Sequence, residues 1–189
     1  MYGEKLELFV RVLLQCKNNK NKIYSLHEPQ TLCIAKGKSH KKYEFGSKVC
    51  FVTGKNKCVI LWAKKFDPNL YDGDTVEETV KQMEGILCYK PDLGIADNVF
   101  RGRKEIFGVK ILTPANQCSK LRDSEKRGTR KRNKRGSVIE LVIGHLKSDF
   151  RMARNILKST LGDAINALMA AAAFNFKRWI RRERVCFLI

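Results

Sequence analysis

Two carboxylates, Asp97 and Glu140, stand in sequence contexts where an acid could do chemistry. Asp97 follows the apolar residues LGIA and is predicted to end a short strand, at the edge where open α/β sheets place their chemistry. Glu140 lies inside the apolar run SVIELVI, and burying an acid is costly unless something compensates its charge. Two such carboxylates in a protein that binds a polyanion suggest Mg²⁺ held beside a scissile phosphate.

Each acid also has a structural interpretation when it is taken alone. Asp97 could belong to a turn, and Glu140 could lie at the edge of an apolar helical face with Lys147 or Arg135 as its salt-bridge neighbour. The charge favours the catalytic interpretation of the pair, because 38 Lys and Arg against 19 Asp and Glu give a net charge of +19. Such an excess predicts a polyanionic partner, most commonly nucleic acid.

Other chemistries have less support in the sequence. The histidines His27, His40 and His145 show no ligand spacing, and the G-x-x-x-x-G-K-[ST] loop is absent. The seven cysteines form no C-x-x-C pair and indicate reduced cytoplasmic thiols. The chain starts without the basic end of a signal peptide, and INALMAAAAF is too short to cross a bilayer. We therefore expect a cytoplasmic protein without a membrane partner.

Hydrophobic periodicity predicts the elements that must position the two acids. Apolar residues at helical spacing predict helices over 4–15, over about 75–88, around Glu140 and over roughly 161–184. β-rich runs predict an antiparallel hairpin from 43–54 and 57–66, a strand that ends at Asp97, and a strand over 106–112. This order of elements indicates an α/β fold.

Residues 120–135 are the most basic part of the chain. They contain nine Lys and Arg and only two acids, without apolar periodicity, so we expect a solvated linker or loop. The candidate DNA-binding residues of this run are Lys126, Arg127, Arg130, Lys131, Arg132 and Arg135. The alternative is that the run binds nothing specific.

Five sequence blocks resemble the carboxyl-terminal half of bacterial insertion-sequence transposases of the DDE type. The blocks are NKIYSLHEPQTLCIAKGKSHKKYEFGSKV, NLYDGDTVEETVKQME, IADNVFRG, IELVIGHLKSDFRMARN and LKSTLGDAINALMAAAAFNFKRWIRR. The resemblance implies a ribonuclease H-like mixed sheet flanked by helices. It also implies an enzyme in which three acids bind two Mg²⁺ ions, to cut DNA at element ends and join the 3′ ends to a target. Residues 1–20 would then be a helical remnant, 21–182 a partial catalytic domain and 183–189 a tail.

The resemblance also assigns roles to individual residues. Asp97 matches the second catalytic Asp and Glu140 the catalytic Glu, so both are the expected metal ligands. Lys147 matches a lysine that faces DNA on the same side of the helix as the Glu. Two positions depart from the family pattern, since Gly136 replaces an Arg and DNVFRG replaces D-R-G-Y-R-G. A bacterial, nucleoid-associated protein is implied.

The first catalytic Asp of the family has no counterpart here. It lies upstream of the YSLHEP block, whereas the first Asp of this chain is Asp67. We therefore expect a truncated transposase that lacks its first strand and first metal ligand, binds DNA and is inactive alone. A complementing amino-terminal half, or a second copy in a homo-oligomer, would be its protein partner.

A noncatalytic basic protein that binds RNA or the ribosome is the alternative. Tyr43, Phe45 and Phe51 could stack on bases from a strand, although core packing is the interpretation we prefer for them. The two hypotheses differ in the acids, because only a transposase requires Asp97 and Glu140 near one another.

Overall fold

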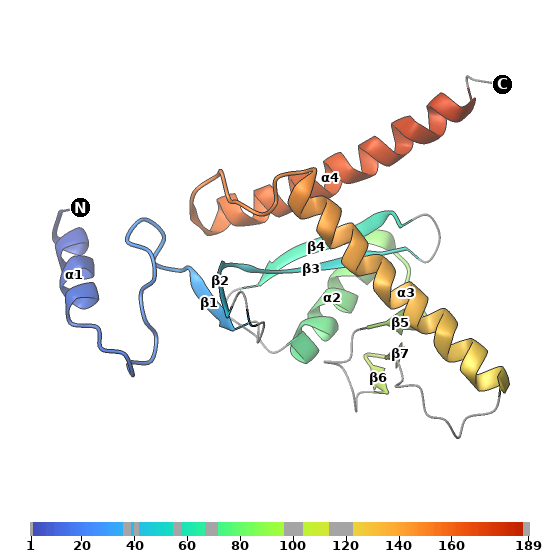
Figure 1. Cartoon of the computed structure of the whole chain (residues 1–189), viewed down its shortest axis with the longest axis horizontal. Coiled ribbons are helices and arrows are strands. Elements are labelled where there is room, and N and C mark those ends of the chain that lie inside the picture. The colour runs from blue at the N-terminus through green and yellow to red at the C-terminus, as the bar shows by residue number, and fades with distance from the viewer. Residues whose placement is uncertain are drawn as a thin grey trace.

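The protein is a mixed α/β structure in which long helices surround small sheets (Figure 1). A computed structural model describes residues 2–35, 39, 42–54, 58–66, 72–96, 104–113 and 123–186. The helices are α1 (Tyr2–Leu13), α2 (Asp72–Leu87), α3 (Asp123–Ser148) and α4 (Ser159–Cys186). In this part of the chain, none of them combines the length and apolarity that a membrane span requires.

The strands of the described residues form three separate sheets. The first pairs β1 (Leu32–Ala35) with β2 (Tyr43–Gly46), and the second pairs β3 (Lys48–Thr53) with β4 (Ile60–Phe66), both antiparallel. The third has the order β5 (Leu93–Ile95), β7 (Val109–Leu112), β6 (Glu105–Ile106), with β5 parallel to β7. The mixed α/β class predicted from the sequence is confirmed.

The predicted hairpin of residues 43–54 with 57–66 is confirmed only for the pairing of β3 with β4. Its first run divides at Gly46, whose φ of 148° is open to glycine but rarely to other residues. Tyr43–Gly46 therefore pairs with β1, which the sequence analysis did not predict, and only Lys48–Thr53 pairs with β4. The single strand expected over 106–112 is also a hairpin, because Phe107 and Gly108 take φ values of 53° and 75° and reverse the chain between β6 and β7.

The prediction of a loop over 120–135 is wrong. From Asp123 onward this segment is the first half of α3, a single helix of 26 residues that continues through Glu140. Arg, Lys and Glu are good helix formers, and the sequence has no proline after Pro114 to interrupt the helix. The apolar periodicity is missing because the buried contacts of α3 come from its second half, through Val142 and Leu146. The other predicted helices are present with ends shifted by one to three residues.

The main core lies between the β3–β4 hairpin and the last two helices. Ile60 of β4 packs with Val142 and Leu146 of α3 and with Ala170, Ala171 and Phe174 of α4. The small alanines allow α4 to lie close against β4. A second cluster joins Trp62 and Phe66 of β4 to Met83 of α2. Burial of these side chains fixes α3 and α4 relative to the sheet.

Two polar contacts fasten α4 to the sheet. The side-chain amide of Asn175 accepts a hydrogen bond from the Ile60 N–H at 2.9 Å and donates one to the Ile60 carbonyl at 2.8 Å. Near the start of α4, the buried carboxylate of Asp163 accepts hydrogen bonds from Ser47 and Asn155 and lies 3.9 Å from Lys65 Nζ. By contrast, α1 has no buried residue and stands apart in Figure 1.

Candidate catalytic site and nucleic-acid interface

Glu140 lies on the solvent-exposed side of α3. Its predicted burial is wrong: Val142 is 3% exposed and belongs to the core, whereas Glu140 projects to the opposite side of the helix and is exposed. Glu140 has no hydrogen bond or ion pair with any other residue that the structure describes. None of the described side chains therefore neutralises its carboxylate.

Lys147 shares the exposed face of Glu140. Seven residues make almost two full turns of an α-helix, so the two side chains point in nearly the same direction, separated along the axis by about 10 Å. Both are exposed on one uninterrupted helix. A ligand on this face of α3 can meet a carboxylate and an ammonium group together.

Asp97 lies outside the described residues, but the strand that leads to it does not. Strand β5 pairs in parallel with β7, and the Ala96 N–H continues this ladder to the Leu112 carbonyl at 3.0 Å. Helix α3, which carries Glu140, contacts β5. The helix that carries Glu140 therefore meets the strand that precedes Asp97 in the sequence.

The donors of this site suit a hard divalent cation. Mg²⁺ prefers carboxylate oxygens and keeps several waters, so an exposed carboxylate such as that of Glu140 fits it chemically. Within the described ranges, no group of three or more His, Cys, Asp or Glu side chains could hold a metal. Of the two predicted metal ligands, Glu140 lies within these ranges and Asp97 does not.

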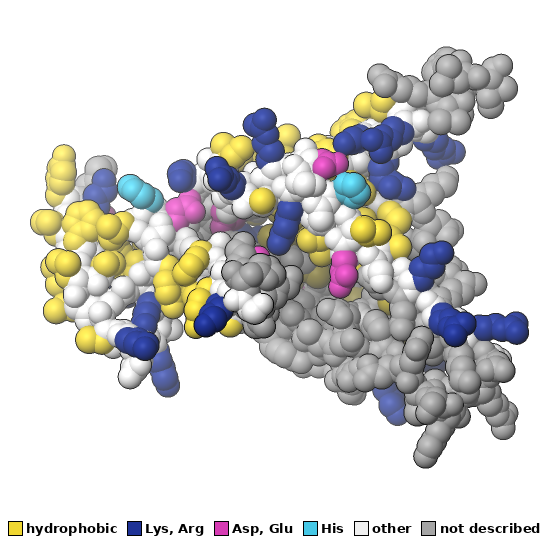
Figure 2. Space-filling view, in the orientation of Figure 1, with side chains coloured by type: hydrophobic (Ala, Val, Ile, Leu, Met, Phe, Trp, Pro, Cys, Tyr) yellow, Lys and Arg dark blue, Asp and Glu magenta, His cyan; other side chains and the backbone are white. Residues whose placement is uncertain are grey.

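The basic residues of α3 extend from this site along the helix. Arg127, Arg130 and Lys134 are exposed on its first half, while the side chains of Lys126, Lys131, Arg132 and Arg135 lie outside the described part. Lys and Arg side chains are visible along α3 and over the outer half of α4 (Figure 2). A phosphate backbone is the partner that such a surface favours.

A second basic site, which was not predicted from the sequence, lies where α3 ends. His145 and Asp149 from this end lie beside Phe174, Lys177, Arg178 and Arg181 of α4. Asp149 accepts hydrogen bonds from Ser148 Oγ at 2.8 Å and Lys177 Nζ at 3.3 Å, and His145 Nδ1 lies 3.1 Å away. These partners, Ser148 foremost, lower the pKa of Asp149 below its ordinary value. The only signal in the sequence was the group of Lys and Arg after the alanine-rich run.

The aromatic side chains of the hairpin region have two different environments. Phe51 packs against the main core, as preferred from the sequence. The prediction of core packing is wrong for Tyr43 and Phe45. They are 57% and 62% exposed because they lie on the outward face of the short β2. The Phe45 ring lies 5.4 Å from that of Tyr24.

The comparisons with known proteins give one match. The family described as the transposase DDE domain matches residues 17–176, which include β1 to β7, α2, α3 and most of α4. Searches of curated proteins and of solved structures found no match for the chain.

Proposed function

This chain belongs to the transposase DDE domain family, and from that premise we propose that it contributes Asp97 and Glu140 to the Mg²⁺ site of an insertion-sequence DNA transposase. The observation that carries the proposal is the contact between α3 and β5. It brings the helix of Glu140 to the strand that runs into Asp97, and a pair of metal ligands requires this. The fold we propose is ribonuclease H-like.

The roles of the residues follow from their chemistry. Bound Mg²⁺ would activate a water or a 3′ hydroxyl and stabilise the charge of the leaving oxygen. Glu140 and Asp97 would supply the anionic oxygens that hold the ion. Lys147, on the same face of α3 as Glu140, would bind a DNA phosphate and orient the strand.

We propose further that this chain does not act alone. Residues 1–66 contain no Asp, and we propose that the first acid of a three-carboxylate site comes from a segment outside these residues. Among the described residues, β5 pairs only with β7, so one of its edges has no strand beside it. Unpaired edges accept added strands, which supports a complementing amino-terminal half or a second copy as partner. Its place in the cell would be the bacterial nucleoid.

The test is a strand-transfer assay with a DNA end substrate and Mg²⁺ or Mn²⁺. The purified chain is expected to be inactive, and addition of a separately expressed amino-terminal half that carries the first Asp is expected to restore strand transfer. Asp97→Ala and Glu140→Gln should each abolish the restored activity. Glu84→Gln, which removes an exposed acid of α2, is the matched control and should not change it.

Two outcomes would contradict the proposal. Strand transfer by the chain alone would disprove the need for a partner, and activity of the mixture that survives Glu140→Gln would disprove the role of that residue.

The noncatalytic alternative gains support from the exposed rings of Tyr43 and Phe45, since exposed aromatics stack on bases. It would be favoured if the chain bound single-stranded RNA more tightly than duplex DNA, and if Tyr43→Ala and Phe45→Ala removed that preference.

A further inference from the structure

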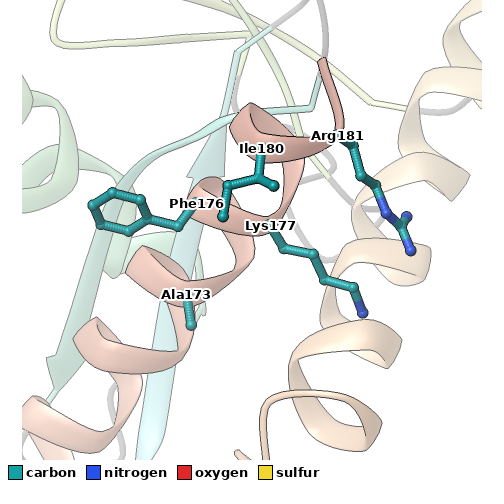
Figure 3. A pocket seen from close by; sticks show the side chains of 5 residues that line it. All are labelled: Ala173, Phe176, Lys177, Ile180 and Arg181. Carbon is teal, nitrogen blue, oxygen red and sulfur yellow. The ribbon is translucent and has the colours of Figure 1, made fainter. Parts of the chain in front are cut away.

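The junction of α3 and α4 forms a hollow that the catalytic proposal does not use. We call it the junction groove and define it by His145 and Asp149 near the end of α3 and by Phe174, Lys177, Arg178 and Arg181 of α4. A separate hollow of about 510 Å³ on α4 shares Lys177 and Arg181 with the groove and is also lined by Ala173, Phe176 and Ile180. Figure 3 shows Lys177 and Arg181 pointing toward the neighbouring helix, α3.

The groove is strongly cationic although it contains one acid. Asp149 is already satisfied by Ser148, Lys177 and His145, so its charge is engaged within the protein. Lys177 Nζ also lies 5.3 Å from the centre of the Phe150 ring. The lysine is thus held by two contacts and presented at a fixed place.

Arg181 is the cation of the groove that remains available. It has no ion-pair partner or ring contact in the part of the chain that the structure describes. A guanidinium group carries five N–H donors in a fork that matches phosphate oxygens, and a neighbouring ammonium adds a point charge. Such a pair suits one phosphate group or two adjacent ones.

The two helices extend this charge in both directions. Figure 1 shows α3 and α4 crossing near the end of α3 and diverging from there. The first half of α3 exposes Arg127, Arg130 and Lys134, and the outer half of α4 exposes Arg178 and Arg182. A ligand with evenly repeated negative charge can contact the groove and either helix at once, whereas an acidic protein segment would carry fewer, unevenly spaced charges.

We propose that the junction groove binds the phosphate backbone of duplex DNA, with Lys177 and Arg181 as the contacting residues. The proposal rests on the function proposed above, since it assumes that DNA is the partner. It adds a second contact, apart from the exposed face of Glu140 and Lys147. Phosphate contacts of this kind position DNA without reading its sequence.

The test measures binding of a fluorescent duplex of arbitrary sequence at several salt concentrations. In the groove variant, Lys177→Gln with Arg181→Gln, the slope of log affinity against log salt is expected to fall by about one for each lost phosphate contact, and so by about two. The matched control, Lys17→Gln with Lys20→Gln, removes the same charge from exposed residues after α1 and should leave the slope nearly unchanged. Circular dichroism should show unchanged helix content in both variants.

The outcomes separate this inference from the proposed function. An unchanged slope in the groove variant, with a lowered slope in Arg127→Gln with Arg130→Gln, would overturn the groove and leave DNA binding intact. Absence of DNA binding by the unmodified chain would overturn both. Polyglutamate is the competing probe: if the groove variant lost affinity for it but not for DNA, the groove would belong to an acidic protein.

Discussion

Asp163 is a buried acid at the start of α4 that joins segments far apart in the sequence. Its carboxylate accepts hydrogen bonds from Ser47, between β2 and β3, and from Asn155, before α4. It also faces Lys65 of β4 at 3.9 Å, with both side chains nearly excluded from solvent. A buried pair of this kind adds little over an apolar replacement, but removal of one partner leaves the other charge uncompensated.

Asp163→Ala is therefore expected to be strongly destabilising. The free energy of unfolding should fall by about 3–5 kcal/mol, because Lys65, Ser47 and Asn155 would all lose the buried carboxylate that they contact. Glu77→Ala is the control: it removes an exposed acid that pairs with Lys81 at 2.7 Å, and should cost less than about 0.5 kcal/mol. Urea denaturation of both variants measures the difference. Equal losses would mean that the Asp163 cluster is not a structural centre.

The candidate site shows what could be predicted at the scale of residues. The shared face of Glu140 and Lys147 follows from their spacing on any continuous helix, so it could be predicted. The exposure of Glu140 could not, because the sequence does not say which side of a helix meets its neighbours. The Asp163 cluster and the junction groove also could not be predicted, since residues 47, 65, 155 and 163, or 145 and 181, become neighbours only when the elements pack.

At the scale of elements, two helical glycines have opposite surroundings. Apart from the adjacent backbone of α3 and the two chain neighbours of Gly144, no described atom lies within 4 Å of the position that a Cβ would occupy at Gly144. At Gly162 of α4, the same atom would lie 2.8 Å from the backbone carbonyl carbon of Leu157. The first glycine only weakens its helix, whereas the second allows a close approach of the chain.

The same substitution should consequently have opposite effects at these two positions. Gly144→Ala is expected to raise the free energy of unfolding by about 0.5–1 kcal/mol, because alanine costs less backbone entropy in a helix. Gly162→Ala should lower it by about 1–3 kcal/mol through the clash with Leu157. Thermal and urea unfolding provide the measurement. Destabilisation by Gly144→Ala would indicate a contact on that side of α3 in solution.

The elements also differ in how far the sequence predicts them. Periodic apolar residues predicted α2, α4 and the β3–β4 pairing because each of these buries one face. The first half of α3 was missed because periodicity reports burial against a neighbour, and none of the described side chains of that half is buried. The β6–β7 reversal was missed because Phe107, an unusual residue at positive φ, occupies half of the turn.

At the scale of the whole molecule, stability is concentrated around α3, α4 and the β3–β4 hairpin. Leu146 of α3 is fully buried in this core. In contrast, α1 exposes Leu6, Phe9, Val10 and Leu13 on an apolar face and has no buried residue. Apolar side chains gather on this helix in Figure 2. The chain thus combines a packed centre with a helix that contributes little to it.

Replacing a large side chain by alanine should therefore lower the free energy of unfolding by very different amounts in these two regions. Leu146→Ala is expected to lower the free energy of unfolding by about 2–5 kcal/mol, since it leaves a cavity in the core. Phe9→Ala should change it by less than about 0.5 kcal/mol, because the side chain is 44% exposed and belongs to none of the described core clusters. Denaturation at low protein concentration measures the free energy of unfolding of both variants. A cost at Phe9 that grows with protein concentration would show that α1 packs against another copy.

The double hydrogen bond between Asn175 and Ile60 makes one backbone amide a reporter on helix α4. The Ile60 N–H bonds a side chain of α4 rather than a neighbouring strand, so its hydrogen can exchange with solvent only when that side chain withdraws. The exchange rate of this single amide then measures how often α4 lifts from the sheet. Since the junction groove lies on the same helix, DNA that binds there would slow the exchange of Ile60 without touching it.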